Sequence, residues 1–130
     1  MLWTAFAITV SYIKNKESMF DDKSDSEIIA LKQTQAKSDM FLDLQEVFGF
    51  DSTTDTDLES LLDDHTARLR EALSYKQLYW YFFENDSGEG TINRERMNRY
   101  AKMYADAKKG FKALKQDSGV INSYIVNMDR

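Results

Sequence analysis

Residues able to do acid–base or metal chemistry are scarce in this sequence. Asp63 and Asp64 stand beside His65, the single histidine, and the chain has no cysteine. Paired carboxylates beside a histidine are suited to acid–base catalysis or to metal binding. Adjacent residues on a helix point about 100° apart, however, so these two carboxylates do not converge. We therefore predict no enzyme activity, no catalytic residue, no metal site and no cofactor, and we interpret His65 as a packed, hydrogen-bonded core histidine.

A second acidic group lies between Asp51 and Glu59. An EF-hand loop that began at Asp51 would need glycine at its sixth position and glutamate at its twelfth. Those positions hold Thr56 and Leu62, so the pattern does not predict a calcium site. Thr56 and Glu59 instead fit a capping box, in which both side chains satisfy backbone groups at the start of a helix.

The elements that position these residues are predicted to be helices. The chain of 130 residues has no proline, which indicates long helices and short connections. Ser24 and Glu27 form a capping box that begins one helix, and Gly49 is placed to end it. Apolar residues at three- and four-residue spacing predict further helices over 58–83 and from Asn93 onward. We predict an all-α fold, a small antiparallel bundle of about four helices, with its bundle domain over 14–116.

Two apolar terminal segments flank that domain. Residues 1–13 alternate partly and are rich in aromatic and β-branched residues, which favours an extended arm or a short strand. A short helix capped by Ser11 or Thr9 and running through Lys16 is the alternative. The tail comprises residues 117–130, and Gly119 within it breaks the preceding helix. A terminal segment this apolar is normally held against another part of a protein. We predict that it binds a partner protein through its apolar residues: Val120, Ile121, Tyr124, Ile125, Val126 and Met128.

Charge is divided unevenly along the chain. Residues 1–64 carry 5 Lys and Arg against 14 Asp and Glu, a net charge of −9. Residues 65–130 carry 12 against 8, a net charge of +4. The halves can pair between copies of the chain or within one bundle, and the sequence leaves both open. Most of the positive charge forms a basic face on the last helix: Arg94, Arg96, Arg99, Lys102, Lys108, Lys109, Lys112 and Lys115.

Aromatic residues are concentrated near the end of the 58–83 helix. They cover every face of a helix, so one packing partner cannot bury them all. We expect some to lie in the core and others to contact a neighbouring subunit. The cluster comprises Tyr75, Tyr79, Trp80, Tyr81, Phe82 and Phe83.

The order of these elements resembles the head–tail connector (adaptor) proteins of tailed bacteriophages. The resemblance covers about residues 9–115 and rests on three segments. They are Thr9-Val-Ser-Tyr-Ile-Lys14 leading to Met19-Phe20, the helix start at Ser24–Ile28, and the long aromatic helix at Arg70–Phe83.

The resemblance implies a structural virion protein that forms a homo-oligomeric ring of twelve copies in the phage neck. Its tail would dock on the portal protein, and its other side would receive a stopper or tail-completion protein. DNA would only pass through the channel, and no membrane is involved. The protein would assemble in the host cytoplasm and reside in the virion neck.

A second hypothesis is a small helical nucleic-acid-binding or regulatory protein that uses the basic helix over 94–115. Phosphate contacts by such a helix would make binding strongly salt-dependent. Against this, the connection from Asn85 to Ile92 is long for a helix-turn-helix motif.

Overall fold

The computed structural model describes residues 1–8, 10–85 and 92–117, with side chains described to residue 114. Every regular element in these ranges is helical, so the predicted all-α class is confirmed. Two short 3₁₀ turns lie at Trp3–Ala5 and Ser18–Phe20. The α-helices of the described ranges are α1 (Val10–Lys14), α2 (Asp25–Ala30), α3 (Gln33–Phe48), α4 (Thr56–Asp64), α5 (Thr66–Glu84) and α6 (Ile92–Asp117).

The number of helices exceeds the expected four or so because two predicted helices are each broken once. The segment that begins at Ser24 is divided by Lys32, whose φ of 48° lies in the left-handed region. Gln77 of α5 donates from Nε2 to the Leu31 carbonyl oxygen at 2.6 Å, which satisfies an acceptor at this break. The predicted ends of the segment are confirmed, since the Ser24 hydroxyl caps Glu27 N–H and Gly49 closes α3 at φ 74°.

The helix predicted over 58–83 is also wrong as a single element. His65, at φ −132° and ψ 34°, separates α4 from α5. The Thr66 hydroxyl donates to the Leu62 carbonyl oxygen across this junction. The start of α4 differs as well, because Asp55 rather than Thr56 is the N-cap. Its Oδ1 accepts from the Asp57 N–H at 2.9 Å, and its Oδ2 accepts from Asp51 N–H at 3.1 Å.

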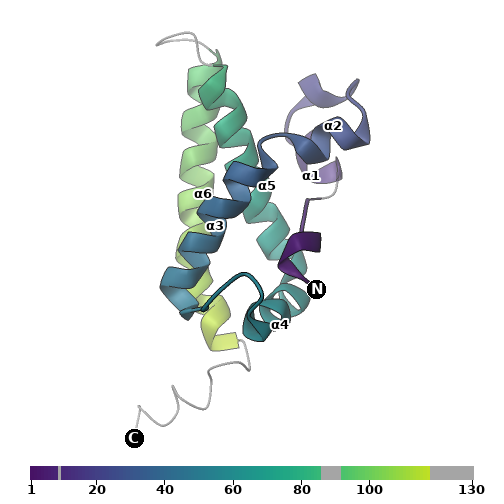
Figure 1. The fold of residues 1–130 in the computed structure, drawn as a ribbon. Coiled ribbons are helices and arrows are strands. Elements are labelled where there is room, and N and C mark those ends of the chain that lie inside the picture. The colour runs from purple at the N-terminus through teal and green to yellow at the C-terminus, as the bar shows by residue number, and fades with distance from the viewer. Residues whose placement is uncertain (9, 86–91, 118–130) are drawn as a thin grey trace, which may run out of the picture.

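Helices α5 and α6 form a long antiparallel pair, and α3 crosses one side of it in contact with both (Figure 1). Phe82, near the end of α5, stacks on Tyr100, near the start of α6. At the other end of the pair, α4 turns beneath α5 and also contacts the first 3₁₀ turn. The pair and α3 therefore make the frame to which the shorter elements attach.

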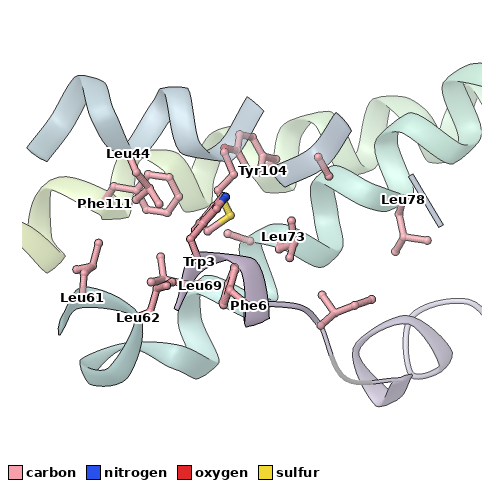
Figure 2. Close-up of a cluster of buried hydrophobic side chains, with 14 of the residues drawn as sticks. Trp3, Phe6, Leu44, Leu61, Leu62, Leu69, Leu73, Leu78, Tyr104 and Phe111 are labelled. Carbon is pink, nitrogen blue, oxygen red and sulfur yellow. The ribbon is translucent and has the colours of Figure 1, made fainter. Parts of the chain in front are cut away.

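The N-terminal segment is not an extended arm or a strand. Its described residues include the first 3₁₀ turn and the start of α1, so the short-helix alternative holds, with α1 over Val10–Lys14. Trp3 and Phe6 point into the cluster that α3, α5 and α6 enclose (Figure 2). Trp3, Phe6, Ile8 and Ile13 are 7%, 0%, 2% and 0% exposed. Residues 1–13 thus belong to the same hydrophobic core as the predicted bundle domain, because their aromatic and β-branched side chains fill it.

The apolar tail predicted over 117–130 lies almost wholly outside the described residues. Helix α6 ends at Asp117, and 118–130 lie outside the described residues, as does the Lys115 side chain. Within the described ranges, no helix combines the length and apolar character that crossing a membrane requires.

Candidate protein-interaction site

The residues considered above for acid–base chemistry, Asp63, Asp64 and His65, lie at the end of α4 and the junction with α5. Asp63 and Asp64 are exposed, and His65 lies half-buried at the α4–α5 junction. Nε2 of His65 is buried and has no hydrogen-bond partner in the described part of the chain, so the hydrogen bond expected of a core histidine is not seen at this nitrogen. No three side chains of His, Asp or Glu gather as a metal-binding group among the described residues.

The aromatic cluster of α5 lies mostly inside the molecule. Phe82 is fully buried, and Phe83 is 50% exposed. Trp80 donates from Nε1 to Asp39 Oδ2 at 2.8 Å, which attaches α5 to α3. Tyr75, Tyr79, Trp80 and Tyr81 are half-buried against the core. Of the six cluster residues, only Phe83 is an exposed large hydrophobic side chain, so contact of the whole cluster with a neighbour is not favoured.

Two basic residues of α6 form ion pairs inside the molecule. Arg96 contacts Glu17 at 3.1 Å, and its guanidinium lies 5.6 Å from the centre of the Phe82 ring. Lys108 contacts Asp43 of α3 at 3.3 Å. The acidic first half and the basic second half of the chain thus pair within one molecule at these points, which was one of the two open alternatives.

Tyr100 of α6 anchors the helix to the segment between α1 and α2. Its hydroxyl donates to Glu17 Oε2 at 2.5 Å, and both side chains are buried. Arg99 lies at 4.0 Å from the same carboxylate. Burial, and then the hydrogen bond to Glu17, raises the pKa of Tyr100 above its usual range. A buried carboxylate that is paired with Arg96 and accepts from Tyr100 has its charge compensated.

Tyr104, one turn further along α6, makes the matching contact with α3. Its hydroxyl donates to Asp43 Oδ2 at 2.5 Å, and Lys76 Nζ lies 4.5 Å from the centre of its ring. Burial, and then the hydrogen bond to Asp43, raises the pKa of Tyr104. The Asp43 carboxylate in turn raises the pKa of Lys108. Two tyrosines four residues apart therefore hold α6 on two separate elements.

The rest of the basic face is only partly engaged. Arg99, Lys102, Lys109 and Lys112 are exposed, and Arg94 is half-buried. Lys109 pairs with Asp106 of its own helix at 4.0 Å. Within the part of the chain that the structure describes, no ion-pair partner is seen for Lys102 or Lys112. The basic face therefore consists of exposed side chains and of side chains that are paired within the molecule.

A groove between α5 and α6 has a volume of about 660 Å³. Its lining includes four small residues: Ala67, Ala72, Ala107 and Gly110. The groove is lined by Tyr12, Ala67, Arg68, Glu71, Ala72, Tyr75, Met103, Asp106, Ala107, Gly110, Phe111 and Leu114.

The sequence pattern singles out some groove residues, among them Tyr75, Ala107 and Leu114, but not Met103, Asp106 or Gly110. Met103, Asp106/Ala107, Gly110 and Leu114 follow one another along α6 at three- and four-residue intervals. This row borders the buried face that carries Tyr100, Tyr104 and Phe111. A Cβ atom placed on Gly110 would have no described neighbour within 4 Å, so this part of the groove is open space.

Comparison with known proteins returns no match: no family model fits the chain, and neither a curated protein nor a solved structure matches it significantly.

Proposed function

We propose that this chain is a structural adaptor of a tailed-phage neck, which joins the portal to the next connector or tail protein without catalysis. The observation that carries the proposal is the open, mostly apolar groove between α5 and α6. Concave surfaces between helices, lined mainly by apolar side chains with a few polar groups, are common places for ligands to bind.

The order of elements supports the same proposal. The segment over 9–20, the helix start at Ser24 and the long aromatic helix fall in the order seen in head–tail connector proteins. The chain would assemble as a ring, of twelve copies by resemblance, with its apolar tail docked on the portal. In that arrangement the exposed basic residues, among them Arg99 and Lys102, face a neighbour or the passing DNA.

Internal ion pairs favour an adaptor over a nucleic-acid-binding regulator. Arg96 and Lys108 are held by carboxylates of the same chain at 3.1 and 3.3 Å. Residues held in this way would have to break existing pairs before they contact phosphate. Helices α5 and α6 also pack side by side along their length, whereas a helix-turn-helix motif crosses its helices at about 90–120°.

Binding to portal rings tests the proposal. The full chain is mixed with portal rings from the same genome, and the mass of the complex is measured by mass photometry. We expect up to twelve copies on each ring. The tail variant Ile121→Ser/Ile125→Ser should lose binding, while the matched control Leu2→Ser, at a residue 58% exposed near the other terminus, should retain it. Absence of any complex with the wild-type chain would contradict the proposal.

A further inference from the structure

Helix α3 covers one side of the α5–α6 pair, and α1 and α4 also contact α5. On that side α3 packs against both helices, and Tyr104 and Phe111 of α6 lie in the core with Leu44 of α3 (Figure 2). The groove lies on another side of the pair and is lined by Met103, Ala107 and Gly110, which are all partly exposed. An apolar groove left open to water is unfavourable, because each Å² of apolar surface removed from water contributes about 25 cal/mol.

The chain itself supplies an apolar segment next to this groove. Leu114 lines the groove three residues before α6 ends at Asp117, and residues 118–130 follow directly. Val120, Ile121, Tyr124, Ile125 and Met128 are spaced i, i+1, i+4, i+5 and i+8 in the sequence. Residues with this spacing share one face when a segment is helical. The tail therefore has the side chains needed to cover a groove between two helices.

The length of the tail and the length of its connection to α6 also suit the groove. The groove runs along α6 from Met103 to Leu114. At 1.5 Å per residue this is about 16 Å, the same length as residues 120–130 in helical form. Ser118 and Gly119 remain as the connection, and two residues are enough to join antiparallel helices. Glycine is suited to this position because it adopts the left-handed conformation that ends a helix and reverses the chain.

We propose that in the free chain the tail, residues 118–130, folds back and occupies the α5–α6 groove of its own molecule. A second copy's tail is a weaker competitor, because a short connection gives the attached tail an effective concentration in the millimolar range. The small residues Ala67, Ala107 and Gly110 let the tail approach closely. This contact is a property of the unassembled chain and stands whether or not the chain docks on a portal.

Crosslinking in the full-length chain tests the contact, and the absence of native cysteine makes each introduced pair unambiguous. One variant carries Gly110→Cys in the groove with Met128→Cys in the tail. Its matched control carries Lys112→Cys with Met128→Cys. Lys112 is exposed, does not line the groove, and is two residues nearer to the tail in sequence. A short bismaleimide reagent is added to dilute protein, and products are separated by mass.

We expect an intramolecular crosslink at Gly110→Cys that forms at least tenfold faster than the one at Lys112→Cys. Equal rates would overturn the proposal, because a tail that does not enter the groove reaches both positions. A faster reaction at Lys112→Cys would overturn it for the same reason. Crosslinked dimers as the main product would also overturn it, since they would place the tail on a second copy.

A wedge variant provides an independent readout. Gly110→Leu puts a larger side chain into the groove at a position where a Cβ atom meets no described neighbour within 4 Å. In a chain with Ala67→Cys on the α5 side of the groove and Met128→Cys in the tail, this wedge should lower the crosslinking rate several-fold. Lys112→Leu, on the outer face of α6, is the control and should leave the rate unchanged. An unchanged rate with Gly110→Leu, at unchanged helical content by circular dichroism, would overturn the proposal.

Discussion

The two sides of the α5–α6 pair differ in how they are closed. On the side that faces α3 and the N-terminal segment, buried apolar residues are joined by two polar anchors, Tyr100 with Glu17 and Tyr104 with Asp43. On the groove side, the lining includes alanine and glycine at partly exposed positions. Contacts within the chain fix the first side, whereas the described residues leave the second side available for binding.

The charged residues and the small residues of α6 therefore have different roles. The positive charge of Arg96 and Lys108 fixes α6 to the acidic first half of the same molecule. Ion pairs of this kind contribute little net stability compared with apolar packing, but they favour one docking position of a helix over others. The small residues do the opposite, because they leave room for a segment that arrives from elsewhere.

The largest expected effect comes from the closed side. Phe6→Ala should lower the free energy of unfolding by about 3–5 kcal/mol, because Phe6 is fully buried and its loss leaves a cavity. Urea denaturation followed by circular dichroism measures the change. Leu2→Ala, at a residue 58% exposed, is the control and should change stability by less than about 0.5 kcal/mol. Equal effects would mean that the N-terminal segment is not part of the core.

Removal of the Glu17 carboxylate is the next largest change. Glu17→Ala should cost about 2–3 kcal/mol, because Arg96 and the Tyr100 hydroxyl lose a buried charged partner. Glu46→Ala is the matched control, since Glu46 is exposed and lies 3.8 Å from Lys108. It should change stability by about 0.5 kcal/mol or less. A coupling energy near zero in a double-mutant cycle of Glu17→Ala with Tyr100→Phe would contradict the anchor.

The tyrosine anchors also predict a dependence on alkaline pH. The pKa values of Tyr100 and Tyr104 are raised in the folded chain. Their stabilising contribution is complete below the ordinary tyrosine pKa of about 10 and is lost as pH rises above it, because only the unfolded chain then releases these protons. The free energy of unfolding should fall less steeply above pH 10 in Tyr100→Phe/Tyr104→Phe than in the wild type. Parallel curves in urea denaturation would contradict this.

The smallest expected effect lies in the groove. Gly110→Ala should raise the free energy of unfolding by about 0.5–1 kcal/mol, because alanine favours a helix over glycine and its methyl group meets nothing within 4 Å. Gly49→Ala is the contrasting control and should be destabilising, since Gly49 has φ 74°. Thermal unfolding of both variants checks the signs. A destabilised Gly110→Ala would show that another part of the chain packs against this glycine more closely than a methyl group allows.

The sequence predicts the local structure best where a helix end has its own chemical signal. Ser24 with Glu27 and the glycine at position 49 set the ends of α2 and α3 as expected. The breaks at Lys32 and His65 were not foreseen, because neither residue is a helix breaker. Contacts from other elements help to satisfy the backbone groups there, as Gln77 does for the Leu31 carbonyl.

The candidate site was less accessible to sequence reasoning. The aromatic residues near 79–83 were expected to be divided between the core and a neighbouring subunit, but the sequence did not tell which is which; Phe82 fills the core, and Trp80 bonds to Asp39. Whether an apolar residue of a helix is buried depends on which neighbours pack on that face, and periodicity does not supply this. Equally, the basic face of α6 could not be assigned to its partners until the fold brought Glu17 and Asp43 beside it.

A map of the particle tests the proposed function most directly. Electron cryomicroscopy of purified virions, with asymmetric reconstruction of the portal vertex, locates the chain in its assembled state. We predict a ring beneath the portal whose density fits the α5–α6 pair crossed by α3 in each subunit, with protein density against the groove. A portal vertex that lacks this chain, in virions shown to be complete, would contradict the account.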